Sequence, residues 1–273
     1  MWDLATVGDN CIDRLTGAVQ AERVGGNALN VAVQAAGAGL RVAYAGAVGP
    51  PGEAEGDRVV AALRRRGVDV RHVVRRDRPT AVTVLLVEPD GERRILREDF
   101  GACAGWRPDA AALRALGRAR HVHIGWLDDG GALRRRLAAA GVPLSQDLGV
   151  TAAPEHLGVE GLSVAFASLP ESEAAGAEAC AACLVARGAR GAVVTLGAAG
   201  SLALMEGRVI RAEAVPLVPA DTTGAGDSYI AGFLAARLRG APLEAAMAEG
   251  HALAARCCRH PGGFPQEDDG AQG

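Results

Sequence analysis

The sequence predicts an α/β protein in which helices cover both faces of a mostly parallel central sheet, giving three layers, with a small β-sheet inserted as a lid. Two observations predict this fold. Short apolar runs alternate along the chain with longer segments that are apolar at helical spacing, an order typical of parallel strands joined by helical crossovers. The alternation is interrupted at residues 79–97, where β-branched and charged residues alternate about Glu88-Pro-Asp-Gly-Glu92, as in a hairpin.

The first half of the chain begins with a short buried strand, residues 4–9, that ends in a glycine and an acid. The elements expected next are a helix at 27–38, a strand at 41–48, a helix at 57–66 and a strand near 68–73. An extended stretch at 12–24 lies between the first strand and the first helix. Together with the hairpin it predicts a lid built from about residues 12–24 and 72–100.

The alternation resumes after Trp106. The expected elements are helices at 109–116, 131–140, 171–187, 228–238 and 243–258, strands at 121–125, 143–148, 163–167 and 191–196, and extended segments at 209–218. Residues 1–265 are therefore expected to form one domain with the lid inserted in it. The polar and acidic end, residues 266–273, is expected to be a loose tail.

Composition excludes several classes of protein. The 273 residues are 49% hydrophobic and carry a net charge of −3, which excludes a disordered chain. The near-neutral charge and an aromatic content of 3% argue against a nucleic-acid partner. No long apolar run or signal peptide is evident. We therefore expect a cytoplasmic location and no membrane partner. The six cysteines read as thiols rather than as a metal site.

The stretch Asp221-Thr-Thr-Gly-Ala-Gly-Asp-Ser-Tyr229 places one acid behind a small-residue turn that opens an apolar helix. Gly224, Ala225 and Gly226 lie at the helix entry, where free N–H groups and the positive end of the helix dipole can hold an anion. Asp227 follows in the first turn, so its carboxylate can take a proton from a hydroxyl that attacks the phosphate. The alternative is an ordinary helix N-terminus with a favourable charge.

A second segment, Val24-Gly-Gly-Asn-Ala-Leu-Asn-Val-Ala32, also puts two glycines before a helix. Gly25 and Gly26 precede Asn27 and Asn30, whose amide groups fall on one helix face. Amides both donate and accept hydrogen bonds, which suits sugar hydroxyls better than phosphates. The alternative is a routine turn with routine caps.

All 29 basic residues are arginine, and the chain contains no lysine. A P-loop and a protein kinase each require a lysine on the phosphates, and a Schiff-base aldolase requires one as its nucleophile. Any nucleotide chemistry must therefore rely on helix termini, Mg²⁺ and arginine.

The two glycine-rich segments, in this order and at this separation, resemble the PfkB (ribokinase-like) family of ATP-dependent sugar kinases over nearly the whole chain. The resemblance implies a ribokinase-like fold, with Asp227 as the catalytic base and Gly224 to Gly226 as the anion hole. It implies that Asp9, behind the first strand, binds substrate hydroxyls. It also places the nucleotide at Thr195, Gly197, Gly200 and Thr223.

Within that family the chain looks most like the fructoselysine 6-kinases, which phosphorylate the 6-hydroxyl of fructosamines. Asn27 stands where many members carry a charged residue, and a neutral amide suits a substrate that bears an ammonium group. The resemblance implies a substrate site made of Asp9, Asn10, Asp13, Gly25, Gly26, Asn27 and Asn30. The alternative for Asn10, Asp13 and Asn27 is the usual polarity of strand ends and helix caps.

The expected cofactor is Mg²⁺ bound with ATP. Ser168-Leu-Pro-Glu171 keeps the acid of the family's metal motif but loses its amide, so Glu171 is expected to act on the metal indirectly. Asp221 matches the position where many members bind a monovalent cation such as K⁺. His251 is expected either to stack on adenine or, as the alternative, to pack in the interior.

Three functions follow from these expectations. The first is an ATP-dependent kinase that phosphorylates a primary alcohol of a sugar or sugar-amine. Fructoselysine is the first candidate substrate, and ribose, fructose and 2-keto-3-deoxygluconate are the next. The second is a catalytically silent relative that binds a sugar or nucleotide. The third is a nucleoside kinase, against which the lack of aromatic residues around the substrate motifs argues. The exposed edges of the lid also predict a homodimer.

Overall fold

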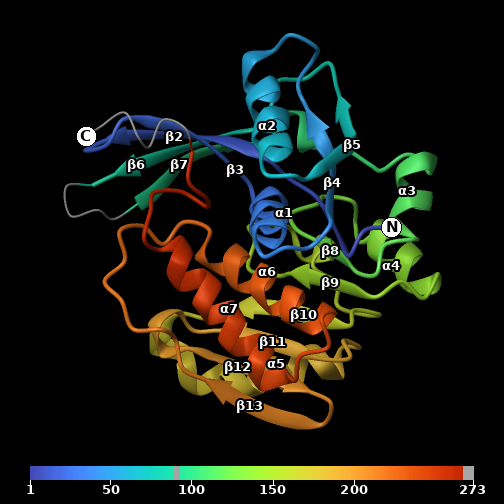
Figure 1. The fold of residues 1–273 in the computed structure, drawn as a ribbon, viewed down its shortest axis with the longest axis vertical. Coiled ribbons are helices and arrows are strands. Elements are labelled where there is room, and N and C mark those ends of the chain that lie inside the picture. The colour runs from blue at the N-terminus through green and yellow to red at the C-terminus, as the bar shows by residue number, and fades with distance from the viewer. Residues whose placement is uncertain (89–92, 267–273) are drawn as a thin grey trace.

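In the computed structural model, which describes residues 1–88 and 93–266, a nine-stranded sheet separates two layers of helices (Figure 1). From edge to edge the sheet contains β13 (Arg208–Ala212), β12 (Ser201–Met205), β11 (Ala192–Thr195), β10 (Val164–Ser168), β9 (Leu144–Asp147), β8 (Val122–Ile124), β1 (Leu4–Val7), β4 (Val42–Val48) and β5 (Asp69–Arg75). Neighbouring strands from β11 to β5 are parallel, whereas β12 and β13 are antiparallel. The predicted three-layer α/β class is confirmed.

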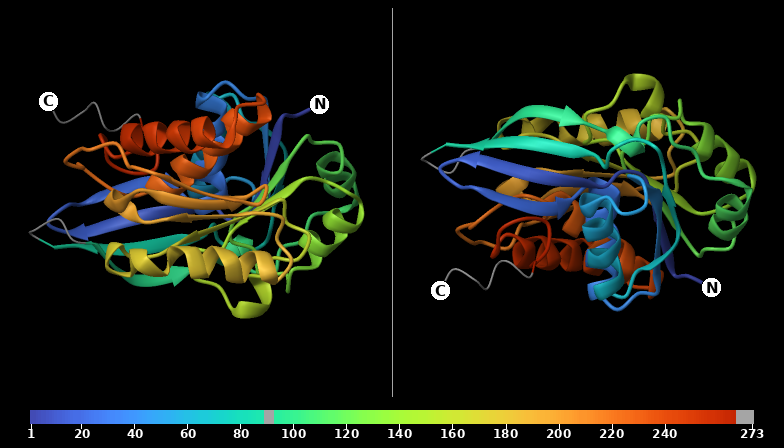
Figure 2. Two further views of the ribbon diagram at one scale, coloured as in Figure 1. Left: turned by 90° about the horizontal axis from the view of Figure 1, so that it is seen from below. Right: turned by 90° about the horizontal axis from the view of Figure 1, so that it is seen from above.

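Two apolar cores lie on opposite faces of this sheet. One joins it to α1 (Asn27–Gly37), α2 (Ala54–Arg65), α6 (Ala225–Leu238) and α7 (Leu243–Cys257). The other joins it to α3 (Ala110–Leu116), α4 (Ala132–Ala139) and α5 (Ala177–Ala186). Figure 2 shows α6 and α7 in red on one side of the sheet and α5 in yellow on the other. Within the described residues, no helix is long and apolar enough to cross a membrane.

A second sheet projects from one side of the molecule (Figure 1). We call it the small sheet; its strands, in order, are β3 (Ala21–Gly25), β2 (Cys11–Gly17), β6 (Val82–Val87) and β7 (Arg93–Asp99). The antiparallel pairing of β6 with β7 confirms the predicted hairpin. Residues 72–75, which we expected in the lid, belong instead to β5 of the large sheet. Strand β7 is an edge strand, and its Ile95 and Leu96 are each 52% exposed.

Several predicted boundaries differ from the structure. Strand β12 was not predicted, and the extended run expected at 209–218 is a strand only as far as Ala212. Helices α2 and α6 begin three residues earlier than expected. The helix expected at 171–187 opens as a 3₁₀ turn, η3 (Glu171–Gly176), and the other 3₁₀ turns are η1 (Gly101–Cys103), η2 (Pro154–His156) and η4 (Gly197–Ala199).

The expected loose tail divides into two parts. Gln266 is held, because its side chain accepts from the Val24 N–H at 2.9 Å and donates to the Val24 carbonyl at 2.7 Å. Residues 267–273 lie outside the described part of the chain.

Helices α6 and α7 approach each other at two glycines. A Cβ atom on Gly232 would lie 2.6 Å from the carbonyl oxygen of Glu249, and one on Gly250 would lie 2.9 Å from the Tyr229 ring. This close packing fixes α6, whose first turn carries Asp227.

We predict that Gly232→Ala lowers the free energy of unfolding by about 1–3 kcal/mol, because the added methyl group meets backbone rather than a side chain that can rotate away. Urea unfolding would measure the change. Gly37→Ala is the matched control: nothing lies within 4 Å of its Cβ position, so it should leave stability unchanged or raise it slightly. Equal stability of the two variants would contradict the argument.

Candidate active site

Acidic and amide side chains meet at the carboxyl ends of the parallel strands, where ligands of open α/β sheets bind. Asp9 follows β1, Asp147 ends β9, Asn27 and Asn30 lie on α1, and Asp227 lies in the first turn of α6. A cavity of about 410 Å³ opens here, between the small sheet and the start of α6. The two glycine-rich motifs are therefore brought together, as the sequence predicts.

Asp227 is held by both asparagines of the first motif. Asn27 Nδ2 donates to Asp227 Oδ1 at 2.6 Å, and Asn30 Nδ2 donates to Asp227 Oδ2 at 2.8 Å. The three-residue spacing of these asparagines explains how one helix face supplies both donors. Each carboxylate oxygen keeps a second lone pair, so a substrate hydroxyl in the cavity can still bind Asp227.

Asp147 is a site residue that the sequence analysis missed. Asn27 Nδ2 also donates to Asp147 Oδ2 at 2.7 Å, so one amide bridges two buried carboxylates. Burial, and then the charge of Asp147, raises the pKa of Asp227 well above its usual range. Burial likewise raises the pKa of Asp147. The only sequence signal was an acid at the end of a buried strand.

Asp9 binds the N-terminus of α1. Its carboxylate accepts from the N–H of Asn27 at 2.9 Å and of Ala28 at 3.1 Å, and its pKa is raised by burial. Gly26 makes this approach possible: its φ is 111°, and a Cβ there would lie 2.5 Å from Asn10 Cα. Gly25 similarly leaves room for the Asp13 carboxylate. Burial raises the pKa of Asp13 to about 6.

The turn before α6 has the shape expected of an anion site. Gly224 is left-handed, with φ 74°, and the Cβ position of Gly226 faces open space. Within the described residues, the N–H groups of Gly226 and Asp227 have no backbone acceptor, but that of Ala225 donates to the Thr222 carbonyl at 3.1 Å. Ala225 therefore contributes to the turn through its conformation rather than through a free N–H.

The expected nucleotide segment lies at the end of β11, outside the 410 Å³ cavity. Thr195 Oγ1 and Ser168 Oγ are 2.6 Å apart, and Glu171 Oε1 accepts from the Ala198 N–H at 2.9 Å. Gly197 and Gly200 both have positive φ, and Gly200 packs directly on the Ala212 carbonyl. Glu171 thus borders the segment where the phosphates of ATP are expected.

No group of three or more His, Cys, Asp or Glu side chains suited to a metal occurs within residues 1–88 and 93–266. Mg²⁺ that is held mainly by substrate phosphates needs only one or two protein carboxylates, so Glu171 fits such an ion. Asp221, the expected site of a monovalent cation, already has a cationic partner: Arg93 Nη2 lies 2.8 Å from its Oδ2. Arg93 also donates to Thr223 Oγ1 at 2.6 Å.

Two expected site residues lie in the interior instead. Asn10 is fully buried, and its Nδ2 donates to Tyr44 Oη at 2.9 Å and to the Ala47 carbonyl at 2.8 Å. His251 is also buried, with Nε2 2.8 Å from Ser201 Oγ and its ring against Tyr229. The packed alternative for His251 is therefore correct, and neither residue lines the cavity.

The cavity lining is acidic on one side and aromatic on another. Its acidic and basic side chains among the described residues are Asp9, Asp13, Arg93, Glu98 and Asp227, so four acids face one cation. Phe100 and Trp126 also line it, stacked with ring centroids 3.7 Å apart. Phe100 and Trp126 thus bring aromatic rings to the site although both lie outside the two glycine-rich motifs, which removes our argument against nucleosides.

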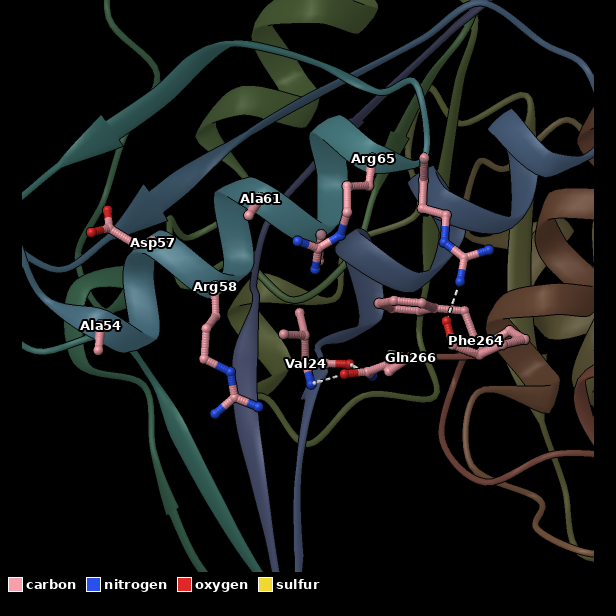
Figure 3. Close-up of a pocket in the computed structure, with 11 residues that line it drawn as sticks. Val24, Ala54, Asp57, Arg58, Ala61, Arg65, Phe264 and Gln266 are labelled. Atoms are coloured by element: carbon pink, nitrogen blue, oxygen red, sulfur yellow. Dashed lines mark hydrogen bonds between the residues drawn. The ribbon is translucent and has the colours of Figure 1, made fainter. Parts of the chain in front are cut away.

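A larger cavity, of about 630 Å³, lies elsewhere, between α2 and the loop at residues 264–266 (Figure 3). Among the described residues, its lining includes Arg58, Arg65 and Arg66, and a single acid, Asp57, which pairs with Arg75. It has neither a glycine turn nor a carboxylate free to act as a base. The smaller cavity is therefore the candidate active site.

The fold and this site together define a phosphotransferase of the ribokinase-like class. The sequence pattern of the pfkB family of carbohydrate kinases matches residues 15–133 and 162–268, and the chain belongs to that family. It is an ATP-dependent carbohydrate kinase.

Known proteins resemble this chain over nearly its whole length. It is 33% identical to a fructoselysine 6-kinase of Shigella flexneri, covering 97% of this chain and all of that one. It is 32% identical to an acarbose 7(IV)-phosphotransferase of an Actinoplanes species, covering 88% and 81%. The solved structure of Arabidopsis thaliana ribokinase complexed with ribose and ATP has the same fold, with a TM-score of 0.83, 22% identity and coverage of 98% and 97%.

We predict that Asp147→Asn moves the acidic limb of the pH profile of kcat/KM to lower pH. A negative Asp147 disfavours a second charge on Asp227, so removing that charge lowers the pKa of Asp227 and keeps the base ionised in more acidic solution. Asparagine is isosteric with aspartate, so the substitution should preserve packing. The midpoint of thermal unfolding is the control for folding. An unchanged acidic limb would show that Asp147 does not act on Asp227.

Proposed function

We propose that the protein phosphorylates the primary 6-hydroxyl of a fructosamine, with fructoselysine as the best candidate. The observation that carries this proposal is the charge of the cavity, in which four acids face one arginine. A sugar-amine brings a positive charge, which such a lining attracts, whereas it disfavours sugar phosphates and sugar acids. The 33% identical fructoselysine 6-kinase supports the same substrate class.

Asp227 is the general base in this proposal. The 6-hydroxyl hydrogen-bonds to its carboxylate and gives up its proton to Asp227 as the oxygen attacks the terminal phosphorus of ATP. The bond from that phosphorus to the β–γ bridging oxygen breaks, and ADP is the leaving group. The amides of Asn27 and Asn30 hold the plane of the carboxylate, so the base does not need to reorient. Burial keeps the pKa raised, which makes Asp227 a stronger proton acceptor than an exposed carboxylate.

The start of α6 stabilises the migrating phosphoryl group. The N–H groups of Gly226 and Asp227 and the positive end of the helix dipole face the position of the charge that develops. Thr195, Gly197 and Gly200 hold the nucleotide, and Asp9, Asp13 and the α1 motif hold the sugar. Mg²⁺ bound with ATP would neutralise the phosphates, and Glu171 would be the carboxylate that acts on such an ion indirectly.

Other acceptors remain as second candidates. The stacked Phe100 and Trp126 offer an aromatic surface to a sugar face or to a nucleobase, so another sugar or a nucleoside is compatible with the lining. A catalytically silent relative is disfavoured because Asp227 and its two amide donors are intact. The half-exposed Ile95 and Leu96 on edge strand β7 support a homodimer through the small sheet, which sedimentation of the enzyme at assay concentration tests.

We predict that Asp227→Asn lowers kcat by about 100- to 10,000-fold, the usual contribution of a general base, while binding of ATP and sugar is kept. ADP release measures turnover, and calorimetry measures binding. Turnover equal to that of the unmodified enzyme would rule out Asp227 as the base.

We predict that an ADP-release panel of fructoselysine, fructose, ribose, 2-keto-3-deoxygluconate and adenosine selects fructoselysine. Glu98→Gln should raise KM for fructoselysine by about two- to fivefold and leave KM for fructose unchanged, because Glu98 lines the cavity but is exposed. Glu88→Gln is the matched control, because Glu88 directly follows β6 and does not line the cavity. Preference for a neutral sugar would keep the kinase and discard the charge argument.

A further inference from the structure

Arg93 joins the small sheet to the turn that precedes α6. It is the first residue of β7, where it pairs with Val87 at the end of β6, so it lies at the far end of the β6–β7 hairpin. Its guanidinium lies 2.8 Å from Asp221 Oδ2 and donates to Thr223 Oγ1 at 2.6 Å, across a separation of 130 residues. The other end of β7 leads through Phe100 into η1, which is buried.

Asp221, the partner of Arg93, is a buried carboxylate that has several hydrogen-bond donors. Its side chain is only 2% exposed, and its carboxylate accepts from the N–H of Thr223 at 2.9 Å and of Gly262 at 2.6 Å. Burial opposes its ionisation, but these N–H groups and the charge of Arg93 outweigh burial and lower the pKa of Asp221. A buried carboxylate that stays ionised requires a counter-charge, so the contact with Arg93 differs from the exposed ion pairs elsewhere on the surface.

Arg93 is also the one Arg, Lys or His side chain that lines the 410 Å³ cavity within the described residues. The acids Asp13 and Glu98 line the same cavity from the small sheet. Among the described residues, Arg93 therefore places the one basic side chain of the cavity lining at the turn before α6, where the phosphate is proposed to bind.

We propose that Arg93 is a positioning residue for phosphoryl transfer, which fastens the small sheet over the turn before α6, residues 221–224, through Asp221 and Thr223. Strand β7 is the edge strand: its last residues lead into the buried η1, its first residue is held by Arg93, and its one strand partner is β6, which β2 also holds. Loss of the Arg93 contact therefore frees the start of β7, and the end of β6 that it pairs with, to move away from the cavity. The aligned sugar would then be held less well and water would enter. The inference rests on kinase activity and does not depend on which sugar is the substrate.

The test uses Arg93→Met, which keeps side-chain length but removes charge and donors, and the double variant Arg93→Met/Asp221→Asn, in which no buried charge is left unpaired. Arg93→Lys is the conservative variant. Arg94→Met is the matched control, because Arg94 is the next residue on β7, is exposed, and lies 3.7 Å from Glu88.

Two readouts are needed. Hydrogen exchange of the backbone amides of residues 82–87 and 94–99 is measured on the enzyme without substrates, and kcat and KM are measured with Mg-ATP and whichever sugar the panel selects. We expect faster exchange in Arg93→Met and in the double variant, and a fall in kcat/KM of about 10- to 100-fold. Arg93→Lys should recover part of the slow exchange and part of kcat/KM. Arg94→Met should match the unmodified enzyme in both readouts.

Three results would overturn the proposal. Unchanged exchange in the double variant would show that Arg93 does not hold the hairpin. Full recovery of kcat/KM in the double variant would show that Arg93 only neutralises Asp221. Normal turnover despite faster exchange would show that fastening the hairpin is not required for transfer. Because exchange is measured without substrate, a wrong sugar assignment leaves that readout intact.

Discussion

The site depends on keeping several carboxylates close together and away from water. Two like charges 4 Å apart repel by about 4 kcal/mol at the effective dielectric typical of a protein surface, and burial adds a desolvation penalty. The structure offsets this mainly with neutral donors. Asp9 takes the first N–H groups of α1, while Asp227 takes the amides of Asn27 and Asn30. The glycine-rich motifs are needed because these donors must approach the carboxylates closely.

Because these donors are neutral, they leave the negative charge of the cavity in place, whereas cationic partners would cancel it. Had lysines paired with these acids, their charges would cancel and the raised pKa of Asp227 would fall. Instead Arg93, the one cation among the described residues of the lining, pairs with Asp221 in the turn before α6. In the proposed reaction, this arrangement would keep a strong base and an attraction for a cationic substrate on one side and place positive charge on the side of the phosphates.

The sequence predicted what local patterns specify. Alternating strands and helices, the β6–β7 hairpin and the helix entries at Gly26 and Gly224 each follow from a few adjacent residues. Asp147 and Arg93 were missed because their partners lie 120 residues or more away, and neither belongs to a glycine-rich motif. Asn10 was expected in the site, and His251 was left between the nucleotide site and the interior, because polarity at a strand end or on a helix does not reveal whether the side chain faces a cavity or the core. Strand β12 was missed because it follows β11 in an antiparallel hairpin, without the intervening α-helix of the alternating pattern.

The structure separates the groups proposed to carry out the chemistry from those proposed to select the substrate. Asp227, Asn27 and Asn30 lie on two helices packed in one core, and the contact of Gly232 with α7 fixes the helix that carries the base. Changes there cost stability as well as activity. Glu98 lies on β7, an edge strand whose side chains are mostly exposed, where substitution costs little. A change of substrate is therefore easiest through β7, provided that Arg93 at its start still reaches the turn.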